Sequence, residues 1–291
     1  MGLGGVVSLK LFVWGHGYVG SRMAQAWPGP VAATSRRADS DHNVHHGHVR
    51  IVPWPVQQSG DACYYASQAD VWLVTVPPVD GEDPVLDCVQ RLNIPIPPYV
   101  GYLSATSVYG GTDGCFRDEN SPLNPSDKRG MARVCVEDRW RSLCADARST
   151  LHIYRLAGIY GPGRDALARI LAGQKHVVDV PGQVMSRIHV DDIVSALVRT
   201  LGFQRAGGAF NLADNFSAST PEVTDFACGL LGREPLAKVS VDAPFISENM
   251  RGFYMNNRRI LARRLKEDFF WRPKYPSYKE GLRASLDILK S

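Results

Sequence analysis

Three glycines near the start of the chain, Gly15, Gly17 and Gly20, have the spacing of a loop that binds phosphate through its backbone. In a G-x-G-x-x-G loop the first glycine makes a tight turn, the second lets the backbone approach a pyrophosphate, and the third lets a helix pack closely on a strand. The N–H groups that open the helix then face the negative charge. We therefore predict that Gly15, Gly17, Tyr18, Val19 and Gly20 bind a dinucleotide; a purely structural turn is the alternative.

A second group of polar residues lies at the end of the next strand-like run, where Ser35 is its last residue and Arg36 and Arg37 follow directly. An acidic residue at this place holds the ribose 2′-hydroxyl of NAD, whereas an arginine accommodates the 2′-phosphate of NADP. The first acid here is Asp39, which comes after both arginines. The order predicts NADP(H) as the cofactor, contacted by Ser35, Arg36 and Arg37; a solvated basic turn is the alternative.

Short apolar runs that alternate with helical segments must position these groups. The runs at 9–14, 31–35, 49–52, 69–76 and 99–104 predict buried strands, and the segments 18–27 and 85–92 predict helices. Pro77 and Pro78 end the fourth strand because proline cannot continue a ladder, so Val76, Pro77 and Pro78 are expected at the carboxyl edge of the sheet, next to the cofactor. The alternation predicts an α/β fold, a Rossmann-type doubly wound parallel sheet.

Composition and charge narrow the class of protein. The 291 residues are 44% hydrophobic and 21% charged, and the formal net charge is +4. The sequence has no dense basic block, so nucleic acid is not an expected partner. No apolar run approaches the roughly 18 to 20 residues that span a bilayer, and no signal-like segment opens the chain. We expect a cytoplasmic protein that binds a small-molecule substrate and no membrane; a homodimer is possible.

The cysteines and histidines do not predict a metal site. The six cysteines show no C-x-x-C pair or zinc-type spacing and are interpreted as reduced thiols. Four histidines lie within residues 42–48, but no cysteine or well-placed carboxylate completes a closed metal site. We predict that this segment is a polar loop between strands.

Five ordered motifs carry a resemblance to a known family. They are the glycine loop and the segments Ser104–Gly110, Arg155–Arg164, Arg187–Ile193 and Phe210–Asp214. In this order and at these intervals the sequence resembles the extended short-chain dehydrogenase/reductase superfamily, the NAD-dependent epimerase/dehydratase group, in a compact atypical branch. The resemblance implies a Rossmann domain mainly within 1–165, completed by segments near 187–214. It also implies a smaller, interleaved substrate-binding part mainly within 166–291.

The residues expected for hydride transfer in that superfamily are absent. Its members carry a Ser or Thr four residues before the Tyr of the V-Y-G motif, and a Y-x-x-x-K with a Glu four residues past the Lys. Here these positions hold Ala105, Arg129 and Arg133, with Glu137 as the helix landmark. Arginine keeps its proton because its pKa exceeds about 12, but it binds carboxylate or phosphate well. Arg129 and Arg133 are therefore predicted to hold anions of substrate and cofactor; pairing with nearby acids on a solvated face is the alternative.

Other hydroxyl groups could take over acid/base work. Thr106 occupies the position where sugar-nucleotide dehydratases of the superfamily have an acidic residue, and Tyr109 is close to it in sequence. We include Thr106, Tyr109, Arg129 and Arg133 as candidate catalytic residues, although a packing role for Tyr109 is the stronger interpretation. His189 precedes a predicted helix and is expected to cap or support it.

Two functional hypotheses follow. The first is an NADP(H)-dependent oxidoreductase or epimerase/dehydratase-like enzyme with a changed acid/base set, acting on a small polar, anionic or sugar-derived substrate. The second is a catalytically degenerate NADP(H)-binding protein that acts as a redox sensor or interaction module. The intact glycine loop and the complete substrate-side motifs favour the first hypothesis, and the missing Ser-Tyr-Lys set favours the second; of the two, we favour the enzyme.

Overall fold

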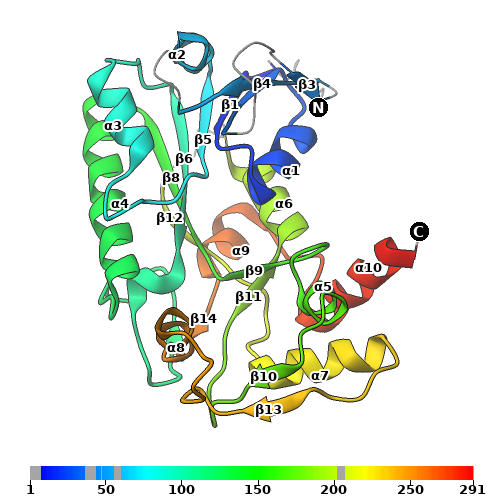
Figure 1. Cartoon of the computed structure of the whole chain (residues 1–291). Helices are drawn as coiled ribbons and strands as arrows, with labels where there is room; N and C mark the ends of the chain where they lie inside the picture. The colour runs from blue at the N-terminus through cyan, green and yellow to red at the C-terminus, as the bar shows by residue number, and fades with distance from the viewer. Residues whose placement is uncertain (1–7, 37–43, 47, 56–59, 202–206, 291) are drawn as a thin grey trace. The chain divides into compact units, whose positions relative to one another are not determined.

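The chain forms two compact units, each built from several segments (Figure 1). The computed structural model describes residues 8–36, 44–46, 48–55, 60–201 and 207–290. Unit 1 comprises 1–104, 132–154 and 194–209, and unit 2 comprises 105–131, 155–193 and 210–291. Neither unit is one continuous segment: 105–131 and 155–193 belong to unit 2, and 132–154 and 194–209 belong to unit 1.

The central sheet has eight strands in the order β12-β8-β6-β5-β1-β2-β4-β3. The pairs β1–β2, β1–β5, β2–β4 and β5–β6 are parallel, and β3 is antiparallel to β4. This confirms the predicted Rossmann-type α/β fold. The strand bounds are Leu11–Trp14 for β1, Val31–Ser35 for β2, Val44–His46 for β3, Val49–Pro53 for β4, Val71–Val74 for β5, Tyr99–Ala105 for β6, Thr150–Leu156 for β8 and Gly208–Leu212 for β12.

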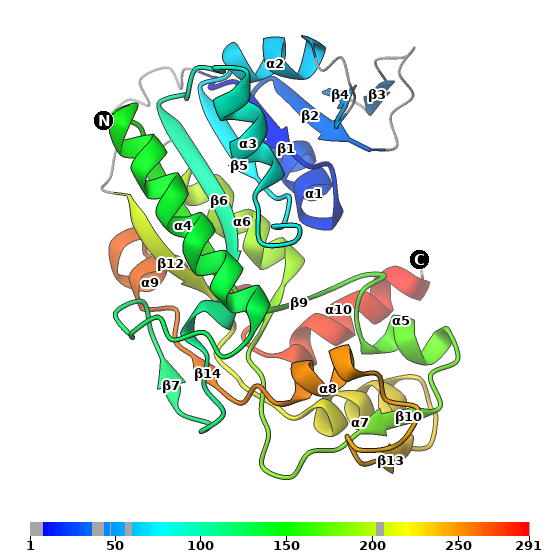
Figure 2. The same ribbon diagram turned by 60° about the vertical axis from the view of Figure 1, so that its left-hand side comes forward.

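Both faces of the sheet in unit 1 are covered, which explains why its strands are apolar along their whole length. On one face the rings of Trp14, Trp72 and Tyr102 pack against the helices α2 (Gly60–Ser67), α3 (Pro84–Arg91) and α4 (Lys128–Asp146). Figure 2 shows α3 and α4 side by side over this face. The other face carries α1 (Tyr18–Ala26), whose Val19 and Met23 are buried. Alternate residues of each strand therefore enter two separate apolar layers.

Helix α3 begins where the sequence provides a cap. Asp83 accepts hydrogen bonds from the backbone N–H groups of Val85 and Leu86 at 2.8 and 3.1 Å, and Pro84 occupies the first helical position. The indole Nε1 of Trp140 in α4 donates to the second carboxylate oxygen of Asp83 at 2.9 Å. One carboxylate thus satisfies helix-end donors and joins two helices on the same face of the sheet.

The histidine-rich segment corrects one prediction. A polar loop is predicted for residues 42–48, but Val44–His46 forms the short strand β3, paired antiparallel with Val49–Ile51. The edge strand β4 offers unpaired backbone groups, and β3 satisfies them. His42, Asn43 and Gly47 lie outside the described residues.

Unit 2 is built from helices and short two-stranded sheets. Its core joins Tyr160, Leu167, Val223 and Leu282, which bring together β9 and three helices. The helix α7 begins with a reciprocal capping box between Ser219 and Glu222. The elements used below are β7 (Phe116–Arg117), β9 (Gly158–Tyr160), α5 (Ala166–Leu171), β11 (Arg187–His189), α6 (Val190–Thr200), α7 (Thr220–Leu230), α8 (Glu248–Tyr254), β14 (Arg259–Ile260), α9 (Arg263–Phe269) and α10 (Tyr278–Lys290).

Candidate functional site

The glycine loop of unit 1 is a tight turn fixed by two threonines. Gly15 has a φ of +106°, a conformation that residues with a Cβ rarely adopt. Its N–H donates to Oγ1 of Thr34 at 2.8 Å, and its carbonyl accepts from Oγ1 of Thr75 at 2.8 Å. A Cβ on Gly15 would lie 2.6 Å from Oγ1 of Thr75 and 3.0 Å from a methyl of Val76. The sequence prediction did not include Thr34 and Thr75, which are the next-to-last residues of the runs 31–35 and 69–76.

Gly17 and Gly20 have opposite surroundings. Nothing lies within 4 Å of a Cβ built on Gly17, so its backbone borders open space. A Cβ on Gly20 would overlap the carbonyl oxygen of Gly15 and lie 3.1 Å from a methyl of Val13. Gly17 is also the N-cap of α1, where no side chain caps the helix and no acid occupies the first turn. The loop thus presents an accessible, uncapped helix N-terminus, a setting that attracts phosphate.

The remaining predicted cofactor residues stand at the ends of β2 and β5. Arg36 is exposed and directly follows β2, and His16 N–H bonds the carbonyl of Thr34 in that strand at 2.6 Å. Ser35 ends β2, and Arg37 lies outside the described residues. Val76, Pro77 and Pro78 follow β5, with Val76 partly buried against the turn of Gly15. These residues lie at the carboxyl edge of the sheet, the same edge at which the glycine loop follows β1. Tyr18 and Val19 form the first turn of α1 there.

Unit 2 contains a cavity of about 1300 Å³ lined mainly by apolar side chains and by more cations than acids. The cations are Lys128, Arg129, Arg164, Arg169, Lys175, Arg187 and Arg258, and the acids are Asp127, Asp165 and Glu248. Thr106 and Arg129 are among its lining residues. A cavity of this composition suits a small organic molecule with negative charge.

Arg187 is the cavity cation that the fold holds most firmly. Its side chain is 9% exposed, and its Nη1 donates to the carbonyls of Met185 at 2.8 Å and Ala218 at 2.7 Å. Its Nε and Nη2 make no hydrogen bond to any residue that the structure describes. Burial lowers the pKa of Arg187, but an arginine starts so high that it keeps its charge. The Nε/Nη2 edge is therefore a preorganised fork for a carboxylate or phosphate.

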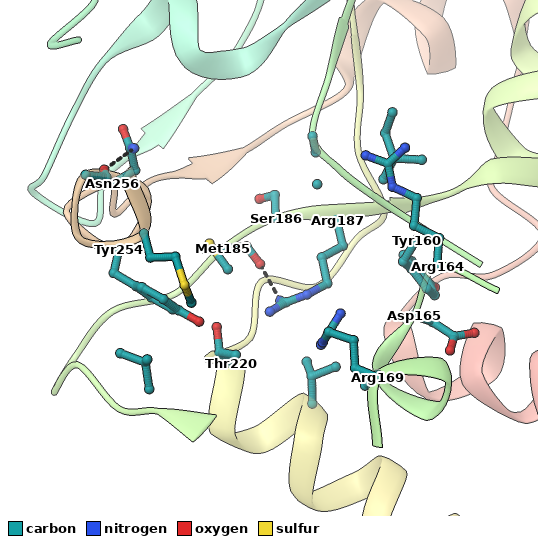
Figure 3. Close-up of a pocket in the computed structure, with 18 of the residues that line it drawn as sticks. Tyr160, Arg164, Asp165, Arg169, Met185, Ser186, Arg187, Thr220, Tyr254 and Asn256 are labelled. Atoms are coloured by element: carbon teal, nitrogen blue, oxygen red, sulfur yellow. Dashed lines mark hydrogen bonds between the residues drawn. The ribbon is translucent and has the colours of Figure 1, made fainter. Parts of the chain in front are cut away.

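Other polar groups gather around this fork. Figure 3 shows Arg187 among Arg169, Thr220 and Tyr254, which come from α5, α7 and α8. Burial raises the pKa of the Tyr254 phenol, and the two arginines oppose this rise. Thr220 is 8% exposed and lies beside that phenol. These groups supply cations and hydroxyl donors but no carboxylate, as an anion-binding site requires.

Unit 2 also buries the carboxyl groups of Asp192 and Asp214. Burial raises the pKa of Asp214 to about 8, with Arg187 opposing the rise and Asp192 adding to it. Burial also raises the pKa of Asp192 to about 6, although its two oxygens accept the backbone N–H groups of Lys274 and Tyr275 at 2.6 and 3.0 Å. The sequence prediction did not single out Arg187, Tyr254 or Asp214 as site residues. The signal for Arg187 was its place at the start of the segment Arg187–Ile193, one of the five motifs of the family resemblance.

The structure separates the candidate catalytic residues of unit 2. Thr106 is buried at 7% exposure and lines the cavity, and Arg129 is exposed and lines it as well. Tyr109 is 2% exposed; its hydroxyl donates to Oδ1 of Asn211 at 2.7 Å and accepts from Nη1 of Arg155 at 2.9 Å. Burial raises the pKa of Tyr109, and Arg155 opposes this. The geometry of Tyr109 is that of a satisfied core tyrosine, which was the stronger interpretation from sequence.

Arg133 belongs to unit 1, where it is directed at the end of β6. Its Nη1 donates to the carbonyl of Leu103 at 2.5 Å and to the hydroxyl of Tyr102 at 3.3 Å. Glu137, one turn further along α4, is buried and accepts from Ser104 at 2.6 Å and from Arg141 at 2.9 Å. These contacts place the guanidinium of Arg133 at the carboxyl end of a central strand, where cofactors bind in such sheets.

His189 and the cysteines complete the set of residues considered in the sequence. His189 is 1% exposed, packs between the rings of Tyr160 and Tyr275, and accepts the N–H of Asp191 at the start of α6. All six cysteines are free thiols. Among the described residues no group of His, Cys, Asp and Glu could hold a metal ion, and none of their helices is long and apolar enough to span a bilayer.

This chain is similar to known proteins both in sequence and in fold. A model of the NAD dependent epimerase/dehydratase family matches residues 77–213. The structure of a functionally unknown conserved protein from Silicibacter pomeroyi DSS is 32% identical, with a TM-score of 0.84 over 96% of this chain and 99% of that one. Protein YeeZ of Escherichia coli strain K12 is 28% identical over 177 residues, which are 57% of this chain and 61% of YeeZ.

A more distant structure shares the fold. The dTDP-glucose 4,6-dehydratase of Bacillus anthracis str. Ames, solved in complex with NAD, is 19% identical, with a TM-score of 0.75 over 97% of this chain and 96% of that one. At this identity the likeness concerns the arrangement of strands and helices. The chain spans 61% of the length of the curated relative YeeZ that it matches, so activities of whole relatives do not transfer directly.

Proposed function

The chain belongs to the NAD-dependent epimerase/dehydratase family, and from this membership we propose that it is an NADP(H)-dependent oxidoreductase or epimerase/dehydratase-like enzyme. Its substrate is a small polar molecule with an anionic group, such as an organic acid or a sugar derivative. The single observation that carries the proposal is the glycine loop, in which Gly15 turns the chain, Gly17 faces open space and Gly20 packs tightly. Each glycine has the environment that dinucleotide binding requires of it.

The choice of NADP(H) rests on the end of β2. Arg36 is exposed there, directly after the strand whose Thr34 bonds the glycine loop. A guanidinium at this place can contact the 2′-phosphate that distinguishes NADP from NAD. In unit 1 Arg133 adds a second guanidinium at the end of β6, suited to a ribose hydroxyl or a phosphate.

The anionic substrate group rests on Arg187 in the cavity of unit 2. Two backbone carbonyls fix one end of its guanidinium, and the other edge has two donors without partners among the described residues. Because the side chain is already ordered and largely desolvated, it loses little freedom when an anion binds. Arg169, Thr220 and Tyr254 add donors around the same point (Figure 3).

Thr106 is the hydroxyl group proposed to contact the reacting part of the substrate. It lines the cavity, whereas Tyr109 has both its hydroxyl interactions satisfied in the core. Arg129 lines the cavity as a fixed cation that can stabilise developing negative charge but cannot exchange a proton near neutral pH. Thr106 therefore orients the substrate oxygen or relays a proton through water.

Thr106→Val should lower the rate of the chemical step by about a hundredfold or more, the range for loss of a positioned proton-transfer group. Valine has the same shape as threonine, so the cavity should be preserved, and Thr106→Ser should restore most of the rate. The measurement is NADPH consumption in a screen of keto acids, lactones and nucleotide sugars. An unchanged rate in Thr106→Val would remove this residue from the mechanism.

A second function, cofactor binding without turnover, is favoured by one observation. The two positions that would hold the tyrosine and lysine of hydride transfer are Arg129 and Arg133, and Arg133 is bonded to the carbonyl of Leu103. Under this alternative the protein is a redox sensor or interaction module. Tight NADPH binding with no activity across the screen above would support it over the enzyme.

A further inference from the structure

Asp214 is a buried carboxyl group next to Arg187 that the proposed function does not use. Its side chain is 4% exposed, and its backbone N–H donates to the carbonyl of Arg187 at 2.7 Å. One carboxyl oxygen, Oδ1, accepts the N–H of Phe216 at 3.0 Å. The other, Oδ2, is buried and has no hydrogen-bond partner among the described residues. A charged carboxylate at this place is incompletely compensated, so a proton on it is favoured.

Charged and titratable groups from several elements surround Asp214. Arg187 of β11 favours its ionised form, and Asp192 of α6 and Glu280 of α10 oppose ionisation. The phenol of Tyr160 in β9 is also within electrostatic reach. Asp214 borders a second cavity of about 400 Å³ in unit 2, whose cations are Arg259 of β14 and Lys266 of α9. Among these charged groups, Arg187 is therefore the one whose positive charge favours the ionised form of Asp214.

We infer that Asp214 takes up a proton when an anion binds to Arg187, so that the site binds an anion and a proton together. An anion on the Nε/Nη2 edge neutralises Arg187 and removes the attraction that keeps the neighbouring carboxylate ionised. Asp214 thereby acts as a positioning residue that sets the charge of the anion site. The inference rests on the proposed anion site at Arg187.

The direction of the pH dependence follows from linkage. The bound state holds more protons than the free state, so the affinity for an anion falls as pH rises through the range where free Asp214 ionises. A shift of one pH unit in that ionisation, from about 8 to about 9, weakens binding about fivefold between pH 7 and pH 9. Lysines and free tyrosines ordinarily titrate above this range and histidines mostly below it, but cysteine thiols and the α-amino group titrate within it, so a variant of Asp214 is needed to assign the proton.

The test is calorimetry of the full chain with benzenesulfonate, an anion that does not titrate in this range. Titrations at pH 8.5 in two buffers of different ionisation enthalpy report how many protons the complex takes up. Uptake of about half a proton at pH 8.5, and about fivefold weaker binding at pH 9 than at pH 7, are expected. Asp214→Asn should abolish the uptake and flatten the pH dependence. Asp191→Asn, which changes an exposed carboxylate at the start of α6, should leave both unchanged.

The outcomes separate the inference from the proposed function. Binding without proton uptake, or uptake that persists in Asp214→Asn, would overturn the inference and leave the anion site standing. Benzenesulfonate that fails to bind, or that binds Arg187→Gln as well as the wild type, would overturn the anion site and the inference together. If Asp214→Asn does not fold, Asp214→Ser, which also lacks the carboxyl group, takes its place in the two-buffer comparison, and uptake that persists in it would overturn the inference.

Discussion

Gly17→Val is expected to lower the affinity for NADPH by at least about hundredfold while the protein stays folded. The Cβ of the variant would enter open space, so no atom of the free protein has to move. The same space is where a pyrophosphate would approach the backbone and the first turn of α1. Loss of two charge-assisted hydrogen bonds to phosphate, about 3 kcal/mol, gives the expected factor. Fluorescence titration with NADPH measures it.

Gly20→Val is the matched control three residues along the same loop. Its Cβ would overlap the carbonyl oxygen of Gly15, so the helix and the turn would have to separate. This variant should lose thermal stability, whereas Gly17→Val should keep the circular dichroism and melting temperature of the wild type. Unchanged NADPH affinity in a folded Gly17→Val protein would show that the loop is only a structural turn.

Arg187→Gln is expected to weaken binding of an anionic ligand in unit 2 by about hundredfold. The substitution removes the Nε/Nη2 fork, whose two charge-assisted bonds contribute about 3 kcal/mol. Calorimetry with benzenesulfonate at pH 7 measures the loss. Arg283→Gln serves as control, because Arg283 is an exposed arginine of α10 that pairs with Glu280 at 3.8 Å.

A structural effect of the Arg187 substitution can be separated from loss of the fork. Glutamine cannot donate to both carbonyls as Nη1 of Arg187 does, so the melting temperature should also fall. Arg187→Lys keeps the charge but not the planar fork, and we expect it to bind the anion with intermediate affinity. Equal affinity in the wild type and a folded Arg187→Gln protein would contradict the assignment of the anion site.

The strands of unit 1 could be predicted because each is marked by a run of consecutive apolar residues. Strands buried on both faces must be apolar at every position, and runs such as Leu11–Trp14 and Val71–Val74 show this directly. The roles of Gly15, Gly17 and Gly20 follow from their spacing after a strand. The strand Val44–His46 was not predicted because it lies at the edge of the sheet. An edge strand forms through backbone pairing with its neighbour, here β4, and does not require an apolar sequence.

The cavity of unit 2 could not be predicted because its residues are distant in the sequence. Arg169, Arg187 and Tyr254 come from α5, β11 and α8, and only the fold of unit 2 brings them together. Nor does a sequence reveal that Nη1 of Arg187 is bound to the carbonyls of Met185 and Ala218. The raised pKa of Asp214 depends on burial, which no local pattern indicates.

The residues at the positions of the expected Ser-Tyr-Lys set were visible in the sequence, but their geometry was not. Ala105, Arg129 and Arg133 stand where a Ser-Tyr-Lys set was expected, and this substitution pattern needs no structure to be seen. The direction of Arg133 toward the carbonyl of Leu103 depends on how α4 packs on β6. Tyr109 illustrates the opposite case, since a tyrosine in a motif can be either catalytic or structural until its hydroxyl partners, Asn211 and Arg155, are known.

NADP(H) binding by unit 1 is the property on which the proposed function depends most, and one measurement tests it directly. Fluorescence titrations of the wild type with NADPH and with NADH, at equal ionic strength, should show at least about tenfold tighter binding of NADPH. This is the effect of one charge-assisted contact between Arg36 and the 2′-phosphate. Arg36→Ala should reduce the difference by weakening NADPH alone. Equal affinities, a preference for NADH, or no binding of either dinucleotide would contradict the account.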